Sequence, residues 1–356
     1  MTLLDRVQGA WPMSLPERLS SCLLVVALLG AVTAPALAQA PALTSLKFSL
    51  DGKLEAPAAF FLIPQDKGYF AREGLNVDVD EGASALDAIT RVASGTYDFG
   101  FADINALIRY RDQNPAAAVK AVFMVYNRPP YAIVARKSRG VTEPKQLEGK
   151  KLGAPGASST FVEWPLFAKL NQIDTSKVTI ENVGIPVRVP MLAAGQLDAV
   201  LGYSFRVYVD LKARGVPIDD IVLMQMSNYG LKLYGSAIVV NSTLAAEKPE
   251  VVRGFLRAVL RGLKETVQNP PAAVDALLKR DDLTEKDVEL ERLRMAIRDN
   301  ILTPEVRMHG YGAVDPAHLE EAIDQLVLGY AFRARPKLED IFDATFLPPA
   351  GDRRVN

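Results

Sequence analysis

The sequence predicts an α/β fold made of two similar lobes, and three observations support this prediction. A phrase of nine residues occurs twice, as Ala-Ser-Gly-Thr-Tyr-Asp-Phe-Gly-Phe at 93–101 and as Ala-Ala-Gly-Gln-Leu-Asp-Ala-Val-Leu at 193–201. Each copy follows a stretch with helical apolar spacing and ends in a short apolar run that suits a buried strand. Predicted strands and helices alternate as far as about residue 240, which is typical of a mostly parallel sheet covered by helices on both faces.

The small and polar residues of the repeated phrase predict where a ligand would bind. Gly95 and Gly195 suit the left-handed residue that ends a helix. Polar and aromatic residues follow each predicted strand, at 103–105 in the first copy and at 203–206 in the second. Ligands of open α/β sheets lie at the carboxyl ends of strands, so the two copies predict a shared cleft. A helix, glycine, aspartate and strand in this order is also a common turn, and two copies alone are compatible with chance.

The first lobe is predicted from four strands and the helices between them. Pro57 suits the first turn of a helix, because proline lacks the N–H that this position leaves unpaired. The chain is punctuated at 127–130 by Asn-Arg-Pro-Pro, where the next unit begins. The expected strands are 46–50, 77–80, the run that follows the first phrase and 119–125, and the expected helices are 58–70, one that starts at 85 and one that starts at 104.

The second lobe repeats the alternation, and the chain then returns to the first lobe. Pro165 would clash inside a continuing helix, so the helix that ends at Asn171 must start late or kink. A return strand is expected at 236–240, and helices dominate from 243 to about 332. The expected strands of the second lobe are 131–135, one that starts near 151, 178–183, the run that follows the second phrase and 221–226.

The first 38 residues have the features of a cleaved export signal. Arg18 precedes an apolar run at 22–32, and Ala36-Leu37-Ala38 has the small-x-small form cut by signal peptidase. The run is short for a membrane span, which makes an uncleaved anchor the less favoured alternative. We therefore predict a soluble periplasmic protein cleaved after Ala38, with Met1 and Met13 both open as the start.

Composition argues against several classes of function. The net charge of −1 gives no basic excess for nucleic acid or a membrane surface. Cys22 is the only cysteine and lies within the export signal, so the mature chain would have no disulfide, thiol nucleophile or thiolate metal ligand. The sequence predicts no cofactor and no metal site.

Several segments together resemble a known family, namely 67–70 with 73–75, 93–103, 143–153, 193–198, and 234–235 through 249–258. In these segments the chain is similar to the solute-binding proteins of nitrate/sulfonate/taurine-type ABC transporters, a family that includes thiamine-pyrimidine binders. The resemblance covers nearly the whole mature chain, and the order and spacing of its segments are more specific than any one of them.

This resemblance implies a type II periplasmic-binding-protein fold, in which two α/β lobes are joined by a two-crossover hinge. Lobe 1 would hold 39–130 plus 236–340, and lobe 2 would hold 131–235. Independently of the resemblance, the Pro-rich run 347–350 predicts that 341–356 is a loose C-terminal tail. The implied function is periplasmic delivery of a small organic solute to an ABC importer, with aromatic, sulfonate and pyrimidine-like ligands as candidate classes. The implied partner is the transporter permease, and a monomer is expected.

The candidate ligand-binding residues of the first lobe follow its predicted strands. Asp103 is expected mainly to cap the next helix, and Asn105 to make a direct polar contact. Arg128 suits either a bond to a ligand anion or a solvated position near the hinge. Phe60 and Phe61 are adjacent on one helix, so at most one of them faces the cleft. The candidates are Glu55, Ala56, Phe60, Asp103, Asn105, Asn127 and Arg128.

The candidates of the second lobe include a hydroxyl-rich loop at 156–160, whose backbone amides and hydroxyls suit an oxyanion or a ring heteroatom. Thr160 and Glu163 have the spacing of a capping box. Trp164 is expected between helix and sheet, with a cleft position as the alternative, and Tyr203 could stack on a flat ligand. The candidates are Ser158, Ser159, Thr160, Trp164, Tyr203, Arg206 and Tyr229.

Two other functions remain open at this point. An enzyme resembling the pyrimidine-forming relatives of the same fold is one, but no catalytic motif is present and both histidines, His309 and His318, lie in the late helical part. A ligand-sensing module for a separate receptor is the other. No single charge dominates the candidates, which favours a planar ligand with donors and acceptors over nitrate.

Overall fold

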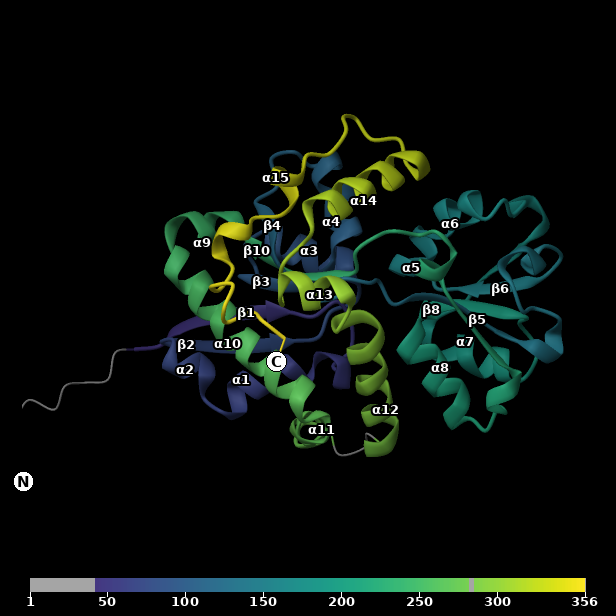
Figure 1. Ribbon diagram of the computed structural model, residues 1–356, viewed down its shortest axis with the longest axis horizontal. Coiled ribbons are helices and arrows are strands. Elements are labelled where there is room, and N and C mark those ends of the chain that lie inside the picture. The colour runs from purple at the N-terminus through teal and green to yellow at the C-terminus, as the bar shows by residue number, and fades with distance from the viewer. Residues whose placement is uncertain (1–41, 282–284, 356) are drawn as a thin grey trace, which may run out of the picture. The chain divides into compact units, whose positions relative to one another are not determined.

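The computed structural model describes residues 42–281 and 285–355, so the predicted export signal lies outside the described residues. The described residues form one compact unit. Within the described part the strands form two five-stranded sheets, which Figure 1 shows side by side. No helix among the described residues has the length and apolarity needed to cross a membrane.

The first sheet has the strand order β2-β1-β3-β10-β4. β1 pairs in parallel with β2 and β3, whereas β10 is antiparallel to both β3 and β4. β10 belongs to the return segment, so a strand from after the second sheet completes the first. Its strands are β1 (Thr44–Ser49), β2 (Leu75–Asp80), β3 (Phe99–Asp103), β4 (Val119–Met124) and β10 (Ser236–Asn241).

The second sheet has the equivalent order β7-β6-β8-β5-β9. β6 is parallel to β7 and β8, and β5 is antiparallel to β8 and β9. Its strands are β5 (Tyr131–Arg136), β6 (Lys151–Ala154), β7 (Thr179–Asn182), β8 (Ala199–Tyr203) and β9 (Ile221–Gln225). We call each sheet with its helices a lobe.

The repeated phrase plays the same part in both lobes. Gly95 and Gly195 follow the helices that end at Ala93 and Ala193, with φ of +76° and +73°. The aspartate three residues later ties the new strand to its parallel neighbour. Asp98 accepts a hydrogen bond from the Lys47 amide at 2.8 Å, and Asp198 accepts one from the Lys151 amide at 2.9 Å. The similarity of the two phrases therefore reflects equivalent positions in two sheets.

The helices cover the sheets and meet between the lobes. Phe255 on α10 (Pro249–Gln268) stacks on Phe99 of β3 with ring centroids 4.0 Å apart, which fixes α10 against the first sheet. Among the helices that follow β10, α12 (Lys286–Ala296) packs against α8 (Ser204–Ala213), so these late helices also contact the second lobe. The first-lobe helices before the crossover are η1 (Ala56–Phe61), α1 (Ile63–Asp66), α2 (Tyr69–Arg72), α3 (Ala85–Ala93) and α4 (Ile104–Gln113).

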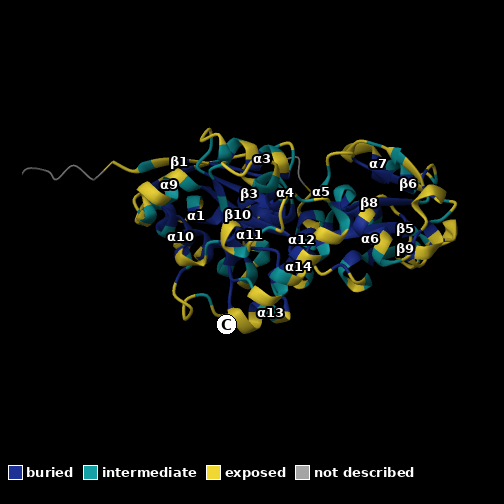
Figure 2. Ribbon diagram, turned by 90° about the horizontal axis from the view of Figure 1, so that it is seen from above, coloured by how far each residue is buried: buried dark blue, intermediate teal, exposed yellow. Residues whose placement is uncertain are grey.

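The central strands of the sheets are buried, and exposed residues lie on the outer helices and turns (Figure 2).

The helices that remain fall into a second-lobe group and a late group. The helices of the second lobe are α5 (Ser159–Val162), α6 (Trp164–Leu170), α7 (Ile185–Ala193) and α8 (Ser204–Ala213). The late helices are α9 (Ser242–Glu247), α10 (Pro249–Gln268), α11 (Pro270–Leu278), α12 (Lys286–Ala296), α13 (Pro304–His309), α14 (Pro316–Gly329) and α15 (Leu338–Ile341).

Three local expectations need comment. The single helix expected at 58–70 is three short pieces, η1, α1 and α2, because Pro64 and Gly68 interrupt it. Pro165 acts as predicted, since α5 ends at Val162 and α6 starts at Trp164. The prediction of a loose C-terminal tail is wrong, because Phe342 and Phe346 are buried and the backbone amide of Tyr311 donates a hydrogen bond to the Arg353 carbonyl.

Candidate functional site

A cleft at the ends of β1 and β8 is lined by residues of both lobes. Its cavity volume is about 100 Å³, below the usual range for small-molecule sites, and the space that includes the open mouth is about 590 Å³. The first lobe contributes Asp51 after β1 and residues 83–85 at the start of α3. The second lobe contributes Pro155, Ala157, Ser158, Ser159, Thr160, Ile185, Arg188, Gly202, Tyr203 and Arg206.

The hydroxyl-rich loop of the second lobe is held by its own hydrogen bonds. Ser158 is the N-cap of α5, since its Oγ accepts from the Phe161 amide at 3.3 Å and donates to the Pro155 carbonyl at 2.9 Å. The expectation that Thr160 caps this helix is therefore wrong. Thr160 is fully buried, and its Oγ1 has no hydrogen-bond partner among the described residues. Thr160 borders the cleft, so a ligand could supply the partner that this buried hydroxyl lacks.

Tyr203 and Arg206 bring the end of β8 into the cleft. The Arg206 guanidinium lies 5.6 Å from the centre of the Tyr203 ring, and Tyr203 stands 6.3 Å from the ring of Tyr131. Arg206 also reaches across to the first lobe, where its Nε donates to Glu55 at 2.8 Å. Burial raises the pKa of the Tyr203 hydroxyl well above its usual value, so this group stays protonated. The sequence predicted Glu55, Tyr203 and Arg206 as ligand-binding candidates, and of these Tyr203 and Arg206 line the cleft.

Two charged residues in the cleft were missed by sequence reasoning. Asp51 directly follows β1, and burial raises the pKa of its carboxyl to about 7 despite the opposing charge of Arg206. Arg188 lies on α7, is 3% exposed, and lines the same cleft. A signal for Arg188 was present in the sequence, because it is the one charged residue in the otherwise apolar run 183–192.

Asp103 and Asn105 form hydrogen bonds with residues of both crossovers. Asp103 accepts hydrogen bonds from the amides of Asn105 and Ala106, so the predicted cap is confirmed. It also accepts one from the Tyr131 hydroxyl. The Asn105 amide group donates to the Tyr131 hydroxyl and to the Tyr234 carbonyl, at 3.0 and 2.7 Å. Both residues are fully buried, so the structure gives them a packing role and no place on the cleft wall.

Four further candidates point away from the cleft. Phe60 is fully buried against Phe61 and Phe101, so neither adjacent phenylalanine faces a ligand. Ala56 is buried, and its amide donates to Glu289 at 2.7 Å. Trp164 packs against Phe167 in the core between helix and sheet, as the sequence predicted. Tyr229 packs edge-on against Phe167 at 6.4 Å and is not among the residues that line the cleft.

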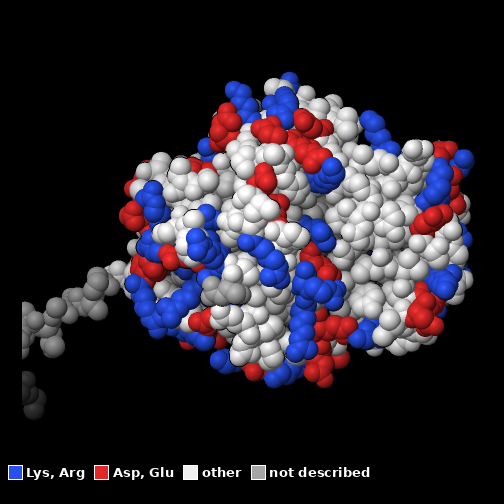
Figure 3. Space-filling model, viewed as in Figure 1, with Lys and Arg blue, Asp and Glu red and all other residues white. Residues whose placement is uncertain are grey.

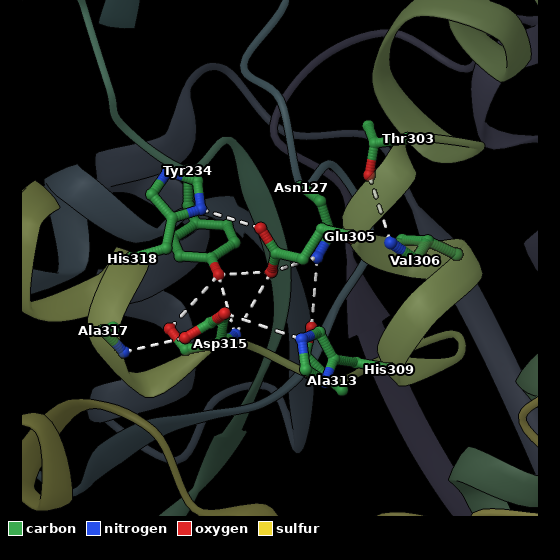
Figure 4. A network of polar contacts seen from close by, with 10 residues as sticks. All are labelled: Asn127, Tyr234, Thr303, Glu305, Val306, His309, Ala313, Asp315, Ala317 and His318. Carbon is green, nitrogen blue, oxygen red and sulfur yellow. Dashed lines mark hydrogen bonds and ion pairs between the residues drawn. The ribbon is translucent and has the colours of Figure 1, made fainter.

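The two crossover candidates contact the late helices instead. Asn127 donates to Glu305 and to the Ala313 carbonyl, at 3.0 and 3.1 Å (Figure 4). The Arg128 backbone exchanges hydrogen bonds with Asn300. His318 belongs to the Glu305 cluster as well, with its Nδ1 2.7 Å from the carboxylate. These contacts anchor the crossover that leads from β4 to β5.

The charges of the molecule do not single out another site. Lysines, arginines and acidic residues are interspersed over the face in Figure 3. A depression between α8 and α12 is larger than the cleft, but it is lined by side chains of helix faces such as Tyr208 and Glu291 and lies away from the carboxyl ends of the strands. Among the described residues no three His, Cys, Asp or Glu side chains are grouped as metal ligands.

Comparison with known proteins identifies a matching family and several similar proteins. A family model described as "NMT1/THI5 like" matches residues 56–273. The chain is 27% identical to the riboflavin-binding protein RibY of Chloroflexus aurantiacus, over 69% of each chain. It is 27% identical to the formylaminopyrimidine-binding protein of Halalkalibacterium halodurans, over 74% of this chain and 79% of that protein. A 4-amino-5-hydroxymethyl-2-methylpyrimidine phosphate synthase of Legionella pneumophila is 25% identical, over 61% and 67%.

Solved structures share the fold at low identity. The alkanesulfonate-binding protein SsuA from Xanthomonas axonopodis superposes with a TM-score of 0.63 at 15% identity, over 85% of this chain and 98% of that one. At this identity the likeness shows the fold alone. The predicted periplasmic-binding-protein fold and the family resemblance are both confirmed.

Proposed function

The chain belongs to the NMT1/THI5-like family, and from this premise we propose that it is a periplasmic solute-binding protein. It binds a small organic ligand in the cleft lined by 51, 83–85, 155, 157–160, 185, 188, 202–203 and 206, and delivers it to the permease of an ABC importer. It acts as a monomer and leaves the ligand chemically unchanged. The observation that carries this proposal is that residues from the strand ends of both lobes line one cleft.

Binding would be coupled to closure of the lobes. A ligand that contacts both walls binds the closed state more tightly than the open state and shifts the equilibrium towards closure. We propose that lobe 1 holds 39–130 plus 236–340 and that lobe 2 holds 131–235. The two connections between the sheets, from β4 to β5 and from β9 to β10, would then be the hinge.

A flat ring with hydrogen-bonding groups at its edge fits the cleft best. Tyr203 offers an aromatic face, and Asp51, Thr160 and Arg188 offer donors and acceptors around it. Two relatives are named for riboflavin and for formylaminopyrimidine, both of which are nitrogen heterocycles. This agreement supports a heteroaromatic ligand, with simple inorganic anions less favoured.

The synthase relatives make an enzyme the second candidate function. Catalysis by a histidine is not supported by the site, since His309 and His318 lie beside Glu305 and Asp315 in the late helices and outside the residues that line the cleft. No cysteine occurs after Cys22. We therefore favour binding without conversion.

The location follows from the same proposal. A solute-binding protein of an importer acts outside the cytoplasm, which agrees with an export signal that ends at Ala38. N-terminal sequencing of the protein isolated from the periplasm tests whether the chain is cleaved after Ala38. A mature chain that begins at Gln39 is expected, and retention of residues 1–38 would contradict it.

The proposed function is tested by titration of ligand-free protein. The mature chain is unfolded, dialysed and refolded to remove bound solute, and is then titrated calorimetrically with riboflavin, aminopyrimidines, aromatic carboxylates and sulfonates. Tyr203→Ala serves as the site variant. Saturable 1:1 binding that Tyr203→Ala weakens is expected, and the absence of binding by every compound would contradict the proposal. Ligand that reappears chemically altered would favour the enzyme.

A further inference from the structure

The cleft contains a buried cation whose side chain has no bonding partner. Arg188 is 3% exposed, and no hydrogen bond or ion pair of its guanidinium occurs among residues 42–281 and 285–355. Arginine stays charged in proteins and carries five N–H donors. A buried charge that lacks both a counterion and hydrogen-bond acceptors is strongly unfavourable, so we expect a bound ligand to supply them.

The nearby carboxylates are already committed to other arginines. Glu55 accepts from Arg206 at 2.8 Å, and Asp210 accepts from Arg292 at 2.5 Å. Both acids lie near enough to Arg188 to act on it electrostatically, but Arg206 opposes them with its own positive charge. Arg188 is therefore the arginine of this cluster whose donors remain free for a molecule in the cleft.

The surroundings of Arg188 are shaped to leave its guanidinium accessible to the cleft. Gly202 lies on the adjoining strand, and a Cβ at this position would stand 2.9 Å from Nη2 and 3.0 Å from Cζ of Arg188. Glycine is thus required for the guanidinium to lie where it does. Thr160, with its unpartnered Oγ1, lines the same cleft and can add a hydroxyl donor.

From this arrangement we propose that the ligand carries an oxyanion, which Arg188 binds through its guanidinium fork with help from the Thr160 hydroxyl. The inference rests on the proposed function and narrows it to heteroaromatic or aromatic compounds that bear a carboxylate, sulfonate or phosphate. The planar guanidinium can donate two parallel hydrogen bonds to two oxygen atoms of such a group. Arg188 thereby becomes a specificity-determining residue that selects charged over neutral members of a ligand class.

The test uses matched pairs of compounds that differ in the charged group. The pairs are flavin mononucleotide and riboflavin, orotate and uracil, and benzenesulfonate and benzenesulfonamide. Each is titrated into refolded wild-type protein and into Arg188→Gln, Arg188→Lys and Arg214→Gln. Arg214 is an exposed arginine at the end of α8, outside the cleft, and is the matched control.

The expected result is a preference for the charged member in at least one pair. Arg188→Gln removes the guanidinium fork, which should weaken binding of the charged member by about 10- to 100-fold. Binding of the neutral member should stay within about twofold of its wild-type affinity. Arg188→Lys keeps the charge without the fork and should fall between, and Arg214→Gln should match wild type. The melting temperature of ligand-free Arg188→Gln should be equal to or above that of wild type, because the substitution removes an uncompensated buried charge.

Three results would overturn the inference. Equal binding of both members of every pair would do so and would leave the proposed function intact. An unchanged preference in Arg188→Gln, together with a lowered melting temperature, would make Arg188 a structural residue. Binding of no compound at all would contradict the proposed function and the inference together.

Discussion

The guanidinium of Arg206 contacts the carboxylate of Glu55 through both Nε and Nη2, at 2.8 and 2.7 Å. Arg206 lies on α8 of the second lobe, and Glu55 precedes η1 of the first lobe. The pair therefore joins the lobes directly at the cleft. Both side chains are about one-fifth exposed, so the pair is only partly screened by solvent.

Breaking this pair should loosen the contact between the lobes. Glu55→Gln removes the carboxylate that is bonded to Arg206 and is expected to lower the free energy of unfolding by about 1–3 kcal/mol. Urea denaturation measures the loss, and small-angle scattering should give a larger radius of gyration for the ligand-free variant. Arg139→Gln is the control, because the Arg139–Asp198 pair lies within one lobe at 2.9 Å. An effect no larger than that of the control would show that the pair does not hold the lobes together.

Asp51 should make stability fall as the pH rises. Burial raises the pKa of its carboxyl from 3.8 to about 7, so the folded chain binds more protons than the unfolded chain between these values. Stability from this group is thus lost as the pH rises towards 7. Asp51→Asn removes the titration and should be more stable relative to wild type at pH 8 than at pH 5. Free energies of unfolding at both pH values test this, with the exposed Asp219→Asn as control, and parallel pH profiles for Asp51→Asn and wild type would contradict it.

A second salt bridge joins the lobes, and its carboxylate is fully buried. Arg109 on α4 donates to Glu163 at 2.5 Å, and the Glu163 side chain is 0% exposed. Glu163→Gln should lower the free energy of unfolding by about 3 kcal/mol or more, since Arg109 keeps its charge in a buried place. Glu250→Gln, which breaks the exposed pair with Arg253, should change it by less than about 1 kcal/mol. Denaturant midpoints decide the matter, and equal losses in the two variants would refute the expectation.

Gly202 should control ligand binding through Arg188. In Gly202→Ala the new methyl would stand 2.5 Å from Cγ2 of Val207 and 2.9 Å from Nη2 of Arg188, so both side chains must move. We expect an oxyanion ligand to bind about tenfold more weakly, with a loss of stability of about 1–3 kcal/mol from overpacking. Calorimetry well below the melting temperature separates the two effects. Gly351→Ala has open space around it and should behave as wild type. Affinity within twofold of wild type would count against the positioning role of Gly202.

The parts of the fold that depend on local chemistry could be predicted from the sequence. The repeated glycine and aspartate marked the same helix-to-strand turn in both sheets, because Gly95 and Gly195 need a positive φ and the aspartates bond to neighbouring strands. The site was predicted in part, through Tyr203, Arg206 and the serines of the α5 loop.

The parts that depend on tertiary packing could not be predicted. Arg188 belongs to a helix that reads as apolar, and only the fold brings it beside Gly202 and into the cleft. Asn127 lies after a strand as ligand-binding residues do, but the late helices meet it first and engage its amide. Phe60 and Phe61 showed no signal for which face is buried, and both are in the core.

A crystal structure with the tightest-binding compound of the titration panel tests the central claim most directly. The predicted result is ligand density between the lobes, in contact with Tyr203 and Arg188 on one wall and with Asp51 or Ser84 on the other. Density confined to the depression between α8 and α12, or in contact with one lobe alone, would contradict it.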